Sequence, residues 1–271
     1  MSELIKITRI TAQKKNKHRY NIFIDEGQGE RFGFSVDEDV LIQYNLRKGL
    51  ELDDAMQATL REQDTWQQSY SKVIGYLGYR MRTKQEVYDY LLKNDVEQEH
   101  VAEIIERLIE QNLLDDRAFS EAFVNTRVQT TLKGPALIKQ ELLQKGVSAD
   151  IADEAVMAID TDVQYEKAQK IVEKKLKKSS KHSQRKQLQN IQANLLRQGF
   201  SESVIQDVLA EASAMDKDAE WEALVYQGER LLRRHQQKTS GFDLQQKIKA
   251  GLYRQGFDME HIGRFLDALE T

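Results

Sequence analysis

Apolar residues recur in a fixed order along most of the chain. A leucine is followed four positions later by glycine, or once by aspartate, and then at once by valine or phenylalanine. Nine positions after the glycine an apolar pair returns. This order predicts a helix that ends, a tight turn and a second amphipathic helix. It occurs four times, at residues 91–96, 142–147, 195–200 and 252–257.

The glycine position explains how one helix ends and the next begins. Glycine enters the left-handed conformation that terminates many helices, because it carries no Cβ. Asp95 takes this position in the first copy, and aspartate tolerates that conformation better than most residues. The residue after the valine or phenylalanine is a candidate N-cap for the second helix. These candidates are Glu97, Ser148, Ser201 and Asp258.

The distance between the copies predicts the architecture. The glycine positions lie 51, 53 and 57 residues apart. A period of about 50 residues indicates stacked supersecondary units, and it leaves room for three helices in each unit. A capping box at Thr83–Glu86 and the pair Gly134–Pro135 mark the start of a middle helix in two units. We therefore predict a mainly α protein, whose tandem three-helix repeats form an elongated curved body.

The N-terminal residues follow an alternating pattern instead. Residues 5–10, 20–24 and 31–36 are typical of short antiparallel strands, and a helix is expected over about 37–44. The basic turn between the first two strands is expected to be a solvated loop rather than a phosphate contact. We expect a β-containing segment with a short helix, and then repeats one to four, over residues 1–64, 65–114, 115–161, 162–214 and 215–271.

A resemblance to a known protein family is carried by residues 112–124, Arg127, Gly134, Pro135, Ile138, Glu141, Leu142, Lys145, Gly146 and Val147. In these residues the chain resembles the RecX proteins, which are bacterial regulators of the RecA recombinase. The resemblance is most specific over about residues 79–159 and becomes looser toward the C-terminus. The short members of the family carry three repeats, and this chain looks like a longer form with a fourth.

The resemblance implies a partner and an activity that neither composition nor periodicity indicates. It implies a helical-repeat body that lies in the groove of the RecA–DNA filament. Separately, we expect the protein to be a monomer. The resemblance also implies modulation, usually inhibition, of ATP hydrolysis, strand exchange and coprotease function. These activities belong to homologous recombination, DNA repair and the SOS response. We expect contact with single- or double-stranded DNA to be part of this role.

Charge is unevenly distributed along the chain, although the net charge is only −4. Residues 95–121 carry nine acidic and two basic side chains, whereas residues 163–200 carry ten Lys or Arg and two Glu. Residues 226–254 are also basic. Such segregation favours contact with phosphates or with an acidic partner over a merely solvated face. The candidate binding residues are Lys174, Lys175, Lys177, Lys178, Lys181, Arg185, Lys186, Arg233 and Arg234. Four of them recur at a spacing of three and four residues and are expected on one helical face: Lys174, Lys177, Lys178 and Lys181.

Composition excludes several other classes of protein. With no cysteine, no apolar run of membrane-spanning length and an unremarkable N-terminus, the chain reads as a cytoplasmic protein. Its five scattered histidines and its glycines match neither a metal site nor a phosphate-binding loop, so we expect no catalysis and no cofactor. Two alternatives to a recombinase regulator stay open: a stand-alone DNA- or RNA-binding protein acting through repeats three and four, and a helical-repeat scaffold.

Six aromatic residues stand at helical spacing and are expected in the core: Tyr76, Tyr79, Phe119, Phe123, Trp221 and Tyr226.

Overall fold

The computed structural model describes residues 4–176, 181–212 and 217–269. Contacts divide the chain into two compact units, residues 1–119 and 120–271. The first unit opens with four strands and a short helix. Their bounds are Ile5–Ala12 (β1), Arg19–Asp25 (β2), Glu30–Asp37 (β3), Glu38–Gln43 (α1) and Glu51–Leu52 (β4).

The strands form one antiparallel sheet in the order β3-β2-β1-β4. Alternate side chains point inward, as the sequence pattern predicted, and include Ile5, Ile7, Ile22 and Ile24. The register shifts once in each long pairing, between Ile7 and Arg9 and between Ile22 and Phe23. The predicted β segment is confirmed, while the short β4 was not predicted, because two residues give no periodicity.

Helix α2 (Asp54–Leu77) serves two hydrophobic cores. Leu60, near its start, packs in the core of the sheet, whereas Val73 packs with the next two helices. Between these contacts lies the buried Asp64, whose two carboxylate oxygens accept from the Arg19 guanidinium at 3.1 and 2.9 Å. The backbone N–H of Asp37 donates to the same carboxylate at 2.8 Å. One continuous helix therefore runs across residue 64, where we expected the β segment to end.

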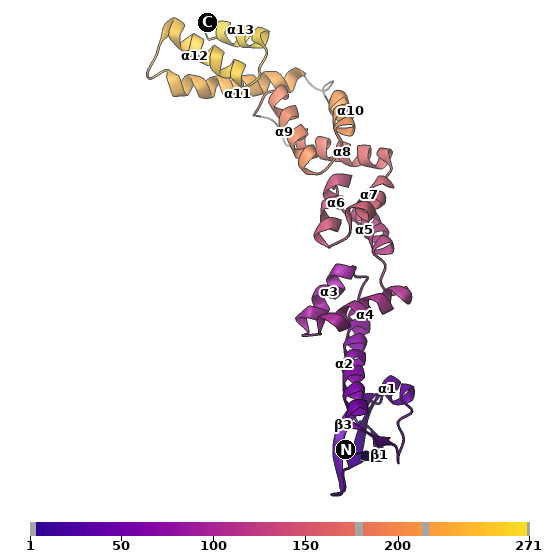
Figure 1. The fold of residues 1–271 in the computed structure, drawn as a ribbon. Coiled ribbons are helices and arrows are strands. Elements are labelled where there is room, and N and C mark those ends of the chain that lie inside the picture. The colour runs from indigo at the N-terminus through magenta and orange to yellow at the C-terminus, as the bar shows by residue number, and fades with distance from the viewer. Residues whose placement is uncertain (1–3, 177–180, 213–216, 270–271) are drawn as a thin grey trace. The chain divides into compact units, whose positions relative to one another are not determined.

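Twelve helices follow the sheet in sets of three, which confirms a mainly α protein of three-helix repeats within the described residues (Figure 1). No described helix has the length and apolar character needed to cross a membrane. After α2, the helices are α3 (Lys84–Lys93), α4 (Gln98–Glu110), α5 (Asp116–Thr130), α6 (Pro135–Gln144), α7 (Ala149–Met157), α8 (Thr161–Leu176), α9 (Gln184–Arg197), α10 (Glu202–Ala212), α11 (Lys217–His235), α12 (Gly241–Arg254) and α13 (Met259–Asp267).

The four predicted junctions share one hydrogen-bond pattern. In each, the N–H of the valine or phenylalanine donates to the leucine five residues earlier, at 3.2 to 3.3 Å. The residue before it has a positive φ, 57° at Asp95 and 79°, 86° and 88° at the three glycines. This is the Schellman ending, so the proposed reason for the repeated glycine is confirmed. Asn45 and Asn112, with φ of 48° and 56°, end α1 and α4 in the same way and were not predicted.

Other local expectations need correction. Ser148 precedes α7 at the N-cap position, but its side chain makes no capping hydrogen bond. Tyr79 and Tyr226 are not core residues, since they are 87% and 37% exposed. Tyr79 lies in the turn after α2, beyond its last helical residue Leu77, whereas Tyr226 lies on an exposed side of α11.

Within the second unit, successive repeats are joined by the same pair of helix ends. The N–H of Gly134, at the start of α6, donates to Gln198 O at 2.7 Å, and Ala136 N–H donates to Gly199 O at 3.0 Å. A Cβ on Gly199 would lie 2.3 Å from the backbone nitrogen of Leu137. In the next pair of repeats, the hydroxyl of Ser183, before α9, donates to Gln255 O at the end of α12. The starts of α6 and α9 thus rest on the glycine junction of the following repeat.

Candidate functional site

The joint between repeats three and four forms one wall of a basic groove. Ser183 is buried and caps α9, since its Oγ accepts from Lys186 N–H at 3.3 Å. The side-chain amide of Gln227, on α11, donates to the carbonyl oxygen of Lys181. A Cβ on Gly256 would lie 3.3 Å from side-chain carbons of Arg185. These contacts bring the start of α9, the middle of α11 and the end of α12 together.

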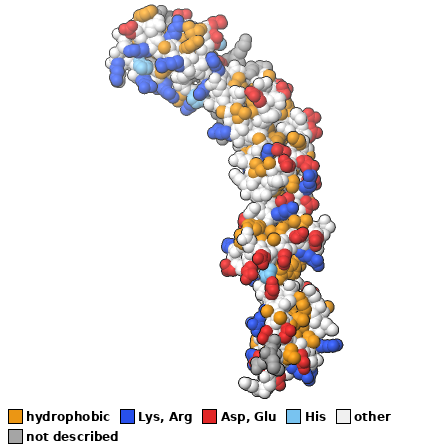
Figure 2. All heavy atoms as spheres, in the orientation of Figure 1, with side chains coloured by type: hydrophobic (Ala, Val, Ile, Leu, Met, Phe, Trp, Pro, Cys, Tyr) orange, Lys and Arg blue, Asp and Glu red, His pale blue; other side chains and the backbone are white. Residues whose placement is uncertain are grey.

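The groove is a cavity of about 460 Å³, and the charged side chains that line it are Lys and Arg. Arg185, Lys186, Arg230 and Arg254 are exposed along it, and the lining residues described include no carboxylate. Several Lys and Arg side chains of this C-terminal region are visible in Figure 2. The other lining residues are His182, Gln189, Gln227, Tyr253, Gln255 and Gly256.

Basic side chains continue beyond the groove. Arg254 also borders a neighbouring hollow of about 590 Å³, together with His235, Lys247 and one carboxylate, Asp243. Its Nε donates to Ala250 O at 3.2 Å, which directs the guanidinium along the end of α12. Lys181 lies with its Nζ 4.8 Å from the ring centre of Tyr226, as in a cation–π contact. The two hollows therefore share a cation and together offer several positions for anionic groups.

The acidic group nearest the start of α9 is already engaged. Glu220 Oε2 accepts from the backbone N–H of Gln184 at 2.6 Å. Burial raises the pKa of this carboxyl, while the hydrogen bond from Gln184 opposes the shift. Glu220 therefore acts as a structural cap of α9 and does not line the groove.

This arrangement suits phosphate groups better than a single small anion. Guanidinium groups make paired hydrogen bonds to phosphate oxygens, and three of them lie in one groove. Tyr253 is 61% exposed beside them and presents a ring on which an unpaired base can stack. No group of three or more His, Asp or Glu side chains in the described part of the chain is placed to hold a metal ion.

The structure brings only part of the predicted cluster together. Arg185 and Lys186 line the groove, and Lys181 lies just before the helix that carries them. Lys174 and Lys175 are exposed in the last turn of α8, away from this lining, and Lys177 and Lys178 lie outside the described residues. Since Lys181 lies in a bend before α9 and not in a helix, the expectation that Lys174 and Lys181 share a helical face is wrong.

Arg233 and Arg234 are exposed in the last turn of α11, also outside the groove lining. Arg233 lies 3.7 Å from Glu229, one turn earlier. Conversely, His182, Arg230, Tyr253 and Arg254 line the groove and were not singled out by the sequence. Arg230 and Arg254 belong to the basic stretch 226–254, but their closeness to α9 depends on how the repeats stack.

The fold and the basic groove define a class of protein, a tandem array of three-helix repeats with a small N-terminal sheet. Comparison with protein families identifies the same parts. Residues 5–53 match the family model "Regulatory protein RecX N-terminal domain". The first and second three-helix domains of RecX match residues 70–108 and 115–156. The third RecX domain matches twice, over 162–209 and 218–266, so repeats three and four are similar to one and the same family domain.

Similarity to individual relatives extends over nearly the whole chain. The regulatory protein RecX of Oceanobacillus iheyensis is 46% identical over 264 residues, which cover 97% of both chains. That of Halalkalibacterium halodurans is 41% identical and covers 96% of this chain and 98% of its own. The chain belongs to the RecX family.

Two solved structures support this assignment. A crystal structure of regulatory protein RecX is 37% identical, with a TM-score of 0.70, and covers 76% of this chain and 99% of its own. The crystal structure of RecX from Lactobacillus salivarius is 33% identical, with a TM-score of 0.54, and covers 56% of this chain and 99% of its own. Both therefore match a part of this chain with nearly their whole length.

Proposed function

We propose that the protein regulates the RecA recombinase by binding the RecA–single-stranded DNA filament, where it slows ATP hydrolysis, strand exchange and coprotease function. The observation that carries this proposal is membership of the RecX family, at 46% identity over 97% of the chain. We further propose that it acts as a cytoplasmic monomer and has no catalytic activity of its own.

The basic groove supplies a physical means of anchoring to the filament. Arg185, Arg230 and Arg254 can each contact a backbone phosphate oxygen, and no carboxylate of the lining opposes them. Lys174, Lys175, Arg233 and Arg234 stay candidates for a wider electrostatic contribution. Since they are exposed, their effect falls with added salt. Acidic side chains of the recombinase are the alternative target of the same cations.

A second candidate function is direct binding of DNA or RNA without the recombinase. The exposed Tyr253 beside three guanidinium groups favours it, because single-strand binders combine a positive groove with stacking aromatics. Under this alternative the protein has similar affinity for naked and for recombinase-coated strands.

Co-sedimentation separates the two functions. We expect the protein to pellet with RecA-coated single-stranded DNA at micromolar concentration and low salt, and to pellet less with the same DNA uncoated. The reason is that the filament offers both phosphates and protein surface, and each adds contacts. Equal pelleting with naked DNA supports the alternative, and no pelleting with the filament removes the proposed function.

A further inference from the structure

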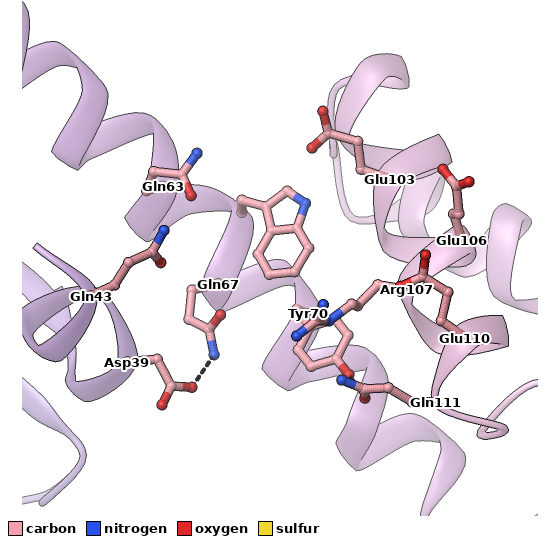
Figure 3. A pocket seen from close by; sticks show the side chains of 11 residues that line it. Asp39, Gln43, Gln63, Gln67, Tyr70, Glu103, Glu106, Arg107, Glu110 and Gln111 are labelled. Atoms are coloured by element: carbon pink, nitrogen blue, oxygen red, sulfur yellow. Dashed lines mark hydrogen bonds between the residues drawn. The ribbon is translucent and has the colours of Figure 1, made fainter.

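A second hollow lies in the first unit, far along the sequence from the basic groove. It has a volume of about 610 Å³ and is bordered by helices α1, α2 and α4. Figure 3 shows Asp39 and Gln43 on one side of this pocket and Glu103, Glu106 and Glu110 on the other. The remaining lining residues are Gln63, Trp66, Gln67, Tyr70, Arg107 and Gln111.

Its charge is opposite to that of the basic groove. The lining has four carboxylates and one cation, Arg107. Glu103, Glu106 and Glu110 are exposed and form no ion pair with any described residue. The carboxylate of Asp39 accepts a hydrogen bond from Gln67 Nε2 at 2.6 Å, and this bond holds the Asp39 side chain toward α2. Three negative charges on one helix are therefore uncompensated within the part of the chain that is described.

Aromatic rings form the base of the pocket. Trp66 and Tyr70 stack with ring centres 5.2 Å apart, and the Tyr70 hydroxyl donates to the side-chain oxygen of Gln111, the C-cap residue of α4. Burial raises the pKa of Tyr70, opposed by the nearby positive charge of Arg107. The indole N–H of Trp66 is buried and donates to no described acceptor.

The pocket already accommodates a guanidinium of the protein itself. In Figure 3, Arg107 extends from α4 toward the ring of Tyr70. Guanidinium groups favour such places, because an aromatic face attracts the cation and the apolar stem packs on the ring. The same features therefore suit further arginine side chains, with three carboxylates available to pair with them.

We propose that this acidic aromatic pocket is a docking site for an arginine-rich segment of a protein partner. Glu103, Glu106 and Glu110 span eight residues of one helix, about 10 Å along its axis. That length fits successive basic side chains of a peptide better than one small cation. Nucleic acid does not fit, because four carboxylates repel phosphates. The proposal concerns a surface separate from the basic groove, and it stands whether or not RecA is the partner.

Tryptophan fluorescence provides a direct test, because the chain has only two tryptophans. In a Trp221→Phe background Trp66 is the sole reporter. We expect a hexa-arginine peptide to change the emission of Trp66 saturably at low salt. Replacing Glu103, Glu106 and Glu110 together by glutamine should weaken this binding about tenfold or more, since each exposed pair contributes about 0.5 kcal/mol.

A charge-matched control uses Glu97, Glu99 and Glu121, which are exposed and do not line the pocket. Their replacement by glutamine should leave the peptide affinity within about twofold, provided that circular dichroism shows all variants folded, because exposed charges outside contact distance are screened. An equal loss of peptide affinity in the control variant would show that binding depends on net charge alone, and would overturn the proposal. It is also overturned if Trp66 does not respond, or if spermidine binds as tightly as the peptide.

Discussion

Replacing Gly199 by alanine should destabilise the protein by about 3 kcal/mol, more than its small size change suggests. At φ +86° a Cβ residue carries strain of about 1–2 kcal/mol. The new Cβ would also lie 2.3 Å from Leu137 N and 2.9 Å from its Cβ. Relieving that overlap adds about 1–3 kcal/mol, because the backbone of α6 must move. Urea unfolding followed by circular dichroism measures the loss.

Gly241 provides the matched control in the same unit. It also has a positive φ, 59°, but a Cβ there meets nothing within 4 Å. Gly241→Ala should therefore cost only the backbone strain, about 1–2 kcal/mol. Equal losses in the two variants would show that Gly199 is needed for its conformation alone. That result would contradict the role of this glycine in joining repeats two and three.

The two roles of Gly199 differ in how far the sequence reveals them. The left-handed conformation is local, so the leucine, glycine and phenylalanine order predicts it without any knowledge of the fold. The contact with Leu137 joins residues more than 60 positions apart, and no periodicity encodes that distance. For the same reason helix number and junctions were predicted correctly, whereas the exposure of Tyr79 and Tyr226 was not.

The triple variant Arg185→Glu, Arg230→Glu, Arg254→Glu should lose binding to the RecA filament on the order of 100-fold at low salt. Each replacement removes a guanidinium–phosphate contact of about 1 kcal/mol or more and adds a repulsive charge. If phosphates are the target, the slope of log affinity against log salt should flatten by about two units, at about 0.7 per contact on single strands. Fluorescence anisotropy over a salt series measures both quantities.

The N-terminal hairpin gives a control with the same change of charge. Lys14, Lys15 and Lys17 are exposed at the turn between β1 and β2, in the other unit. Their replacement by glutamate should change filament affinity less than tenfold, because exposed charges away from the contact are screened. If the groove variant loses filament binding and keeps naked-DNA binding, acidic recombinase side chains are the target. If the groove and hairpin variants bind alike, the groove is not the anchor.

The candidate groove could be predicted only in part. Arg185 and Lys186 stand in an obvious basic run, and they point into the groove because Ser183 starts α9 directly before them. Arg230 and Arg254 lie on two other helices, α11 and α12. The contacts of Gln227 with Lys181 and of Ser183 with Gln255 bring those helices to the start of α9. Charge counts identify basic segments. They do not show which segments meet, because that depends on packing between repeats.

The rate of RecA ATP hydrolysis on single-stranded DNA, measured with and without this protein, tests the central claim most directly. We expect turnover to fall as the protein is added at micromolar concentration. The variant with Arg185, Arg230 and Arg254 replaced by glutamate should need far more protein for the same effect. Unchanged turnover in the presence of the folded parent protein would contradict the proposal that it regulates the recombinase.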